Sequence, residues 1–133
     1  MKERFSDLSK NFDEFKQKSK EFIDILVINE EAEVIYKGPK VPNHLDDVSI
    51  KKIYKKWIGH DNHNDFFKIN EVRYVILKRE LFQFCAINIA GGKGICGSIT
   101  KKNNYCLGFL KQGSTNSLIV SSVVLNKWIW DLI

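Results

Sequence analysis

The sequence is poor in the residues that mark several common classes of protein. It has two prolines, one methionine and three cysteines in 133 residues, and it has no C-x-x-C pair. The missing pair argues against a zinc ribbon and a dithiol redox centre. We expect Cys85, Cys96 and Cys106 to be small buried side chains. No apolar run approaches the roughly 20 residues that cross a bilayer, and Met1 to Lys20 is too charged for a signal peptide. These absences predict a cytoplasmic protein that does not span a membrane.

Arginine is also scarce. Among the 21 basic side chains only Arg4, Arg73 and Arg79 carry a guanidinium group, so the net charge of +5 comes mainly from lysine. Lysine cannot form the planar forks with which arginine binds phosphate groups. The composition therefore does not favour a nucleic-acid-binding protein, and a mildly basic surface fits an acidic protein partner as well.

Two short motifs resemble ligand sites, and their spacing argues against both. Asp61, His63 and Asp65 repeat the first three ligand positions of a calcium loop, but the required glycine and the closing glutamate are replaced by Phe66 and Val72. The stretch 90–94 is rich in glycine and contains a lysine, but a strand pattern follows it instead of the helix that a phosphate-binding loop needs. A tight hairpin turn explains those glycines better. We expect no metal and no cofactor, and no nucleophile or paired catalytic carboxylates point to an enzyme.

What the sequence does contain is a long strand-rich stretch from Phe66 to Lys111. Apolar and β-branched residues alternate there with polar ones, which predicts successive antiparallel strands. The predicted breaks between these strands are Lys78–Leu81, Ala90–Gly94 and Lys102–Asn104. A further hairpin is predicted earlier in the chain, where the polar link 29–32 joins Ile23–Ile28 to Glu33–Lys37.

Three helices complete the prediction. Residues 4 to about 20 form an amphipathic pattern, and a second helix is capped by Asp46 or Asp47 and ends near Gly59. Its predicted apolar stripe comprises Val48, Ile50, Ile53, Tyr54, Trp57 and Ile58. The last helix starts at Asn116 or Ser117, runs to the end and is apolar nearly all round. Trp128 and Trp130 lie about 200° apart on such a helix and cannot share a face.

This order of elements is shared by two known folds, the profilin fold and the roadblock/longin-like fold. Local residues favour the first. Ile69–Leu77 resembles the profilin strand that carries a basic residue, an aromatic residue and an apolar run. Gly91–Gly94 and Gly97–Lys102 resemble the glycine-lysine loop, the next strand and the Lys-Lys hairpin of profilins, and Leu107–Phe109 resembles the strand after them. The divergence and composition are more similar to an Asgard-archaeal profilin than to a plant or animal one.

The resemblance implies an α+β, profilin-like fold over the single domain 1–133. One central antiparallel sheet would carry the N- and C-terminal helices on one face and the middle helix on the other. The implied function is that of a cytoskeletal, actin-monomer-binding protein that regulates actin polymerisation and is itself a monomer. The alternative is a roadblock/longin-like dimeric scaffold for a small GTPase. Such domains dimerise through the second helix, and the lysines on that helix argue for a monomer because like charges would meet across a two-fold axis.

The resemblance also assigns site residues. By position, the expected contacts with actin or an actin-like protein are Lys78, Lys93, Gly97, Ser117, Val120 and Ser121. Ser121 stands where many profilins have a lysine. A polyproline groove would involve Phe5, Trp128 and Trp130, but Ile35 occupies the position of a family tryptophan, so we expect weak or absent binding of proline-rich peptides. Phosphoinositides are a further candidate partner, through Lys51–Lys56 or Lys101–Lys102.

Overall fold

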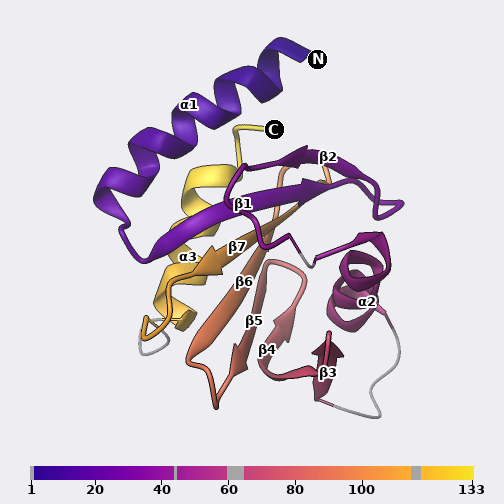
Figure 1. Ribbon diagram of the computed structural model, residues 1–133. Coiled ribbons are helices and arrows are strands. Elements are labelled where there is room, and N and C mark those ends of the chain that lie inside the picture. Colours follow the sequence, from indigo (N-terminus) through magenta and orange to yellow (C-terminus); the bar gives the residue numbers. More distant parts are fainter. Residues whose placement is uncertain (1, 44, 60–64, 115–117) are drawn as a thin grey trace.

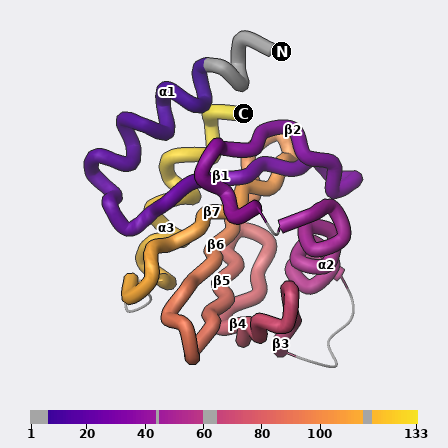
Figure 2. The backbone as a smooth tube through the Cα atoms, in the orientation of Figure 1, coloured from indigo at the N-terminus to yellow at the C-terminus, as the bar shows by residue number. Residues whose placement is uncertain are grey.

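The computed structural model describes residues 2–43, 45–59, 65–114 and 118–133, with side chains from residue 7 onward. These residues form a seven-stranded antiparallel sheet with the strand order β2-β1-β7-β6-β5-β4-β3, together with three helices. The bounds are α1 Lys2–Lys18, β1 Phe22–Ile28, β2 Val34–Lys37, α2 Asp47–Ile58, β3 Phe66–Ile69, β4 Val72–Glu80, β5 Gln83–Asn88, β6 Lys93–Ile99, β7 Tyr105–Leu110 and α3 Leu118–Ile129. Figure 2 follows the chain from β3 to β7 through consecutive hairpins, each strand beside the next.

The helices lie in two layers, one on each face of the sheet (Figure 1). Helices α1 and α3 cover one face, and α2 covers the other. The alternation along the strands explains this arrangement, because successive side chains point to opposite faces. In β1, Ile25 and Val27 pack with α1 and α3, whereas Leu26 and Ile28 pack with α2. The structure thus confirms the predicted α+β architecture and its layers.

Helix α2 begins and ends where the sequence predicts. The Asp46 side chain accepts a hydrogen bond of 2.8 Å from the Ser49 amide, and this bond holds the pKa of the Asp46 carboxyl below its usual value. At the other end, the Gly59 amide donates to the Lys55 carbonyl. One residue of the predicted apolar stripe is misplaced. Val48 is 71% exposed, because it lies in the first turn on the side away from the sheet.

Several boundaries differ from the prediction. The break expected at Lys78–Leu81 lies at residues 81–82, because β4 continues to Glu80. The stretch expected as one strand over Ile69–Leu77 contains a hairpin turn, at which β3 ends and β4 begins. The turn residues Asn70 and Glu71 have φ values of 48° and 68°, the left-handed conformation that two-residue hairpins favour. Helix α3 ends at Ile129 instead of running to the end of the chain. Its predicted first residues, Asn116 and Ser117, lie outside the described residues.

The two tryptophans of the C-terminal segment point to different places, as the helical geometry predicts. The Trp128 ring stacks on Phe15 of α1, with ring centroids 4.6 Å apart and an interplanar angle of 20°. Trp130 packs instead against the α2-side core, and its ring lies 5.8 Å from that of Phe82 in the β4–β5 turn. The three cysteines are buried between the sheet and the α1–α3 layer, also as predicted.

Candidate partner-binding face

Helix α3 exposes apolar side chains to water. Ile119, Val120 and Val123 are 47%, 64% and 44% exposed, although the opposite side of the helix already buries Leu118 and Leu125 against the sheet. The helix is apolar nearly all round, so covering one side of it leaves an apolar outer side. Contiguous exposed apolar surface is uncommon on monomeric proteins and marks interaction sites.

The neighbouring strands β4 and β5 extend this surface. Lys78 pairs with Cys85, and the Cys85 thiol donates to the Leu118 carbonyl of α3 at 3.8 Å. Directly paired residues of antiparallel strands share a face, so Lys78 lies on the face that α3 partly covers. Val75 pairs with Ile87, which packs against the same layer. We call this surface the α3–β4 face and define it by Val75, Lys78, Ile87, Ile119, Val120 and Val123.

The end of this face near the β5–β6 turn is hollowed. A hollow of about 360 Å³ is lined by Arg73, Val75, Asn88, Ile89 and Ala90. The Asn88 side chain donates to the Arg73 carbonyl at 2.8 Å, which joins two residues of the lining. The Arg73 guanidinium lies 4.5 Å above the centre of the Phe66 ring, which holds this cation in place. Ile89 is 71% exposed at the rim and offers a partner further apolar area.

Side-chain hydrogen bonds hold α3 on the sheet. The Gln83 amide donates to the Ile119 carbonyl at 3.2 Å and to the Ser122 hydroxyl at 2.6 Å. Further along, the Asn126 amide donates to the Ser98 hydroxyl of β6 at 2.6 Å. These bonds join β5 and β6 to the inner side of α3. The exposed valines and isoleucine are therefore presented on a fixed helix, which lowers the entropy lost when a partner binds.

Charge is sparse on the α3–β4 face. Lys78 Nζ lies 3.9 Å from Glu80 Oε1, and the two side chains are 35% and 62% exposed. An ion pair so close to water contributes little to stability. The lysine remains available to an acidic group of a partner, since its side chain is partly exposed.

Two of the predicted contact residues, Lys78 and Val120, lie on the α3–β4 face. Lys93 is exposed, but alternation from Ile95 places it on the α2 side of the sheet, away from Lys78. Ser117 lies outside the described residues.

The other two predicted contacts, Gly97 and Ser121, are buried and offer a partner no side-chain contact. A Cβ atom on Gly97 would lie 2.7 Å from the Trp57 ring, so glycine is required there by the packing of α2. Ser121 is 2% exposed because its side of α3 faces the sheet. For these two residues the expectation of a surface contact needs correction.

The site contains residues that the sequence analysis did not single out. Ile119, Val123 and Ile87 belong to the face, and Ile89 lies at its rim. The sequence feature that could have pointed to these residues is that α3 carries apolar residues on all sides. A helix that lies on one sheet needs a single apolar stripe, so a second stripe indicates a second contact.

Two of the predicted polyproline-binding aromatics, Trp128 and Trp130, do not come together. An open groove of about 760 Å³ runs between α1 and α3, and its apolar lining includes Phe15, Val124, Trp128 and Leu132. Trp128 is stacked on Phe15 there, whereas Trp130 packs at the β4–β5 turn on the other side of the sheet. The Phe5 side chain lies outside the described residues.

The candidate phosphoinositide lysines lie on two separate surfaces. Lys51, Lys52 and Lys55 are exposed on α2, and Lys101 and Lys102 are exposed in the β6–β7 turn. In the described part of the chain, no group of three or more His, Cys, Asp or Glu side chains is placed to hold a metal ion. Within the same residues no helix is both long and apolar enough to cross a membrane.

Comparison with known proteins identifies the fold. No protein-family model matches the chain. The chain is 29% identical over 109 residues to Loki profilin-3 of Lokiarchaeum sp. (strain GC14_75), a match that covers 81% of this chain and 84% of that protein. LokiProfilin1 superposes with a TM-score of 0.72 at 14% identity over 96% of this chain and 98% of the other. Acanthamoeba castellanii profilin IA gives a TM-score of 0.67 at 11% identity over 90% and 94%.

A third structure, LokiProfilin2 in complex with rabbit actin, gives a TM-score of 0.72 at 11% identity over 96% of this chain and 98% of the other. The architecture is therefore that of a profilin-like protein. In sequence the chain is similar to Loki profilin-3, and in fold it is similar to the profilins of Lokiarchaeum and Acanthamoeba. These similarities favour the profilin interpretation over the roadblock scaffold.

Proposed function

We propose that this protein binds monomers of actin or of an actin-like protein through the α3–β4 face and thereby regulates polymerisation. It acts as a monomeric, cytoplasmic binding protein and not as an enzyme. The observation that carries the proposal is the exposed apolar outer side of α3, held rigidly beside the partly exposed Lys78. Two similar structures, those of LokiProfilin1 and LokiProfilin2, are complexes with rabbit actin, which supports this choice of partner.

The composition of the face predicts how the affinity arises. A specific interface buries roughly 1,600 Å² in total, and a few residues near its centre carry most of the binding energy. The face offers aliphatic side chains at its centre and few charges, so burial of apolar surface supplies most of the affinity at about 25 cal/mol per Å² before the costs of association. Lys78 then acts mainly on the rate of association.

The first test is Lys78→Glu in a pyrene-actin assembly assay. We expect the wild-type protein to slow spontaneous assembly and the variant to bind monomers about three- to tenfold more weakly, because one rim charge is reversed. The matched control is Lys51→Glu, which makes the same charge change on the exposed side of α2, on the opposite face of the sheet. The control should slow assembly as the wild-type protein does.

Two results would contradict the proposal. The first is an unchanged rate of assembly at tens of micromolar wild-type protein, well above a micromolar dissociation constant. A dimer by light scattering in the same sample would move the interpretation to the roadblock scaffold. The second is loss of activity in Lys51→Glu with full activity in Lys78→Glu, which would place the contact on α2.

For proline-rich peptides we predict no saturable binding in the micromolar range. A polyproline II helix needs several aromatic rings in line, and in the α1–α3 groove Phe15 covers one side of the Trp128 ring. The measurement is a tryptophan-fluorescence titration with decaproline. Comparison with Trp128→Phe shows whether any change arises in the groove. Saturation at micromolar peptide that disappears in this variant would show the prediction to be wrong.

A further inference from the structure

The β4–β5 turn carries two exposed apolar side chains. Its residues are Leu81 and Phe82, between Glu80 and Gln83, which pair and close the hairpin. Turn positions usually hold Gly, Asn, Asp, Ser or Pro, because these residues suit the backbone of a turn. Here the side chains of Leu81 and Phe82 are 49% and 52% exposed. Turn chemistry therefore does not explain why a phenylalanine lies at this tip.

The Phe82 ring lies against Trp130, the residue that follows α3. The two ring centroids are 5.8 Å apart and the ring planes are inclined by 54°. Trp130 is partly buried and packs against the α2-side core. We call Leu81, Phe82 and Trp130 the Phe82 patch. Aromatic side chains of this kind offer a large contact area and are enriched among the residues that carry the energy of interfaces.

The backbone under both rings is fixed by hydrogen bonds. On the Phe82 side, the Glu80 carbonyl accepts a bond of 2.8 Å from the Trp57 indole of α2. On the other side, the Trp130 carbonyl accepts a bond of 2.9 Å from the Lys101 amide of the β6–β7 turn. The Trp130 amide also donates to the Asn126 carbonyl at 3.0 Å. A partner would thus meet two rings already held in place, which lowers the entropy lost on binding.

Exposed ion pairs flank the patch on both sides. One is the pair of Lys78 and Glu80, and the other joins Lys101 Nζ to Asp131 Oδ1 at 3.8 Å, with side chains that are 68% and 80% exposed. Each pair contains one charge of each sign, so these pairs give the surroundings of the patch no net charge. Aromatic residues at the centre and polar groups at the rim are the usual arrangement of a protein interface.

The Phe82 patch borders the α3–β4 face. The Gln83 side chain, next to Phe82 in the chain, donates to the Ile119 carbonyl of that face. By itself the patch is too small for a stable complex, because a specific interface buries roughly 800 Å² on each partner. An aromatic side chain can bury at most about 250 Å², and these are already partly buried. A partner that covers the patch must therefore cover the α3–β4 face as well.

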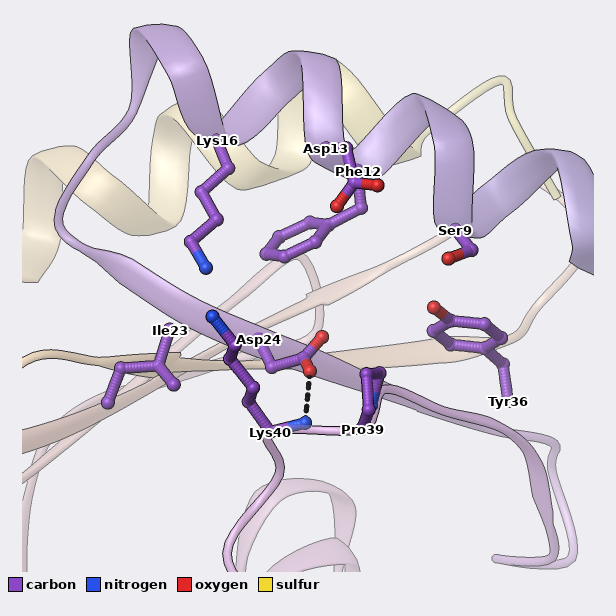
Figure 3. A pocket seen from close by; sticks show the side chains of 9 residues that line it. All are labelled: Ser9, Phe12, Asp13, Lys16, Ile23, Asp24, Tyr36, Pro39 and Lys40. Atoms are coloured by element: carbon purple, nitrogen blue, oxygen red, sulfur yellow. Dashed lines mark hydrogen bonds between the residues drawn. The ribbon is translucent and has the colours of Figure 1, made fainter.

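A pocket of about 140 Å³ on the other side of the molecule lacks such features. It lies between α1 and the β1–β2 hairpin, and its lining contains as many carboxylates as lysines (Figure 3): Asp13, Asp24, Lys16 and Lys40. The Asp24 oxygens accept bonds of 2.8 Å and 2.7 Å from the Ile25 and Lys40 amides, so this carboxylate holds the fold together. Balanced charges give this pocket no preference for a charged ligand.

We propose that Phe82, supported by Trp130, is an aromatic anchor of the partner-binding surface, and that its ring enters an apolar hollow of an actin-like partner beside the α3–β4 face. The inference rests on the proposed function, since one partner covers both surfaces. It makes Phe82 a determinant of specificity. A partner with a charged group at this place would bind more weakly, because the charge would lose its water against the ring.

The experiment measures both rates of binding to monomeric actin by surface plasmon resonance. Phe82→Ser should weaken the affinity about 10- to 30-fold, as expected for an aromatic residue that carries binding energy. The change should lie in the dissociation rate and persist at high salt, because the association rate depends mainly on charge. Phe82→Leu keeps an apolar side chain and should weaken binding only about threefold.

Val34→Ser is the matched control. It removes a partly exposed apolar side chain from β2, which lies at the opposite end of the strand order from β4 and β3. This variant should bind actin as the wild type does, and thermal unfolding should show that all variants are folded. Equal weakening by Val34→Ser and Phe82→Ser would overturn the inference, because the effect would then be general to exposed apolar residues.

Hydrogen exchange of the wild-type protein tests the inference without a substitution. In the complex with monomeric actin, amides of α3 and of the β4–β5 turn should both exchange more slowly than in the free protein. Slower exchange in α3 alone would show that the partner does not reach Phe82.

Failure of the inference can be told from failure of the proposed function. If Phe82→Ser binds like the wild type while Val120→Asp combined with Val123→Asp does not, Phe82 is no anchor and the α3–β4 face stands. If the wild-type protein does not bind actin at all, both are wrong. A dimer by light scattering that dissociates in Phe82→Ser would assign the patch to a second copy of this chain and would also overturn the inference.

Discussion

Trp57→Ala is expected to lower the free energy of unfolding by about 3–5 kcal/mol. The Trp57 side chain is 3% exposed and lies at the centre of the α2-side core. Its ring stacks on Phe84 at 5.4 Å and meets the edge of Tyr105 at 5.3 Å. Its Nε1 donates to the Glu80 carbonyl at 2.8 Å, so alanine would leave both a cavity and an acceptor without its donor. Urea unfolding followed by circular dichroism measures the loss.

Two further variants show how much of the lost stability comes from the hydrogen bond of Trp57 and how much from its buried position. Trp57→Phe keeps most of the ring and removes the hydrogen bond, so it should cost about 1–2 kcal/mol. Trp128→Ala removes the same residue type from a half-buried position and should cost less than Trp57→Ala. Equal costs for the two alanine variants would contradict the central position of Trp57.

Gly97→Ala tests the same contact from the sheet side. The added methyl group would press on the Trp57 ring, and overpacking of this kind costs about 1–3 kcal/mol. In a Trp57→Leu background the cost should shrink, because the smaller side chain leaves room. The folded Gly97→Ala protein should bind its partner as the wild type does. A loss of binding without a loss of stability would indicate that Gly97 contacts the partner after all.

The layers of the fold were predicted through the resemblance to profilins, which implies two helices on one face of the sheet and one on the other. The structure agrees, since Ile25 and Leu26 of β1 point to opposite faces and each face is covered by helices. The predicted cap, Asp46 or Asp47, gave one helix boundary to within one residue, since a side chain that accepts from a nearby backbone amide is a local feature; the structure assigns the cap to Asp46.

The turn at Asn70–Glu71 could not be predicted in the same way. Two-residue hairpins of this kind usually contain glycine, and here neither residue is one. The apolar positions change phase across the pair, from Ile69 to Val72, but the resemblance of Ile69–Leu77 to a single profilin strand led to the prediction of one uninterrupted strand. The turn forms because Ile69 pairs with Val72 in the folded sheet, and that pairing depends on contacts of the whole sheet.

The candidate site was predictable only in part. Position in the chain pointed to Lys78 and Val120, which the structure places on one face. For Gly97 and Ser121 the sequence carries no sign of burial, because small residues occur both at interfaces and under packed helices. For Ile119 and Val123 the all-round apolar character of α3 concealed which side faces water. Exposure is a property of the packed structure and cannot be read from one helix.

The largest effect on function is expected from negative charge on the outer side of α3. Val120→Asp, combined with Val123→Asp, should weaken binding to actin at least about 100-fold, because both side chains are exposed on the α3–β4 face and a charge there must be desolvated on binding. Stability should change by no more than about 0.5 kcal/mol for each substitution, as for other surface positions. Monomer affinity by fluorescence titration measures the first effect, and urea unfolding measures the second.

Val48→Asp is the matched control for this pair. It makes the same substitution on another helix, at a position that is 71% exposed on the opposite face of the sheet. Ionic strength then separates two contributions to affinity. The defect of Lys78→Glu should shrink at high salt, because screening weakens exposed charges, whereas that of the double aspartate variant should largely persist. If the double variant bound actin like the wild type while Val48→Asp did not, the binding surface would lie on the α2 layer.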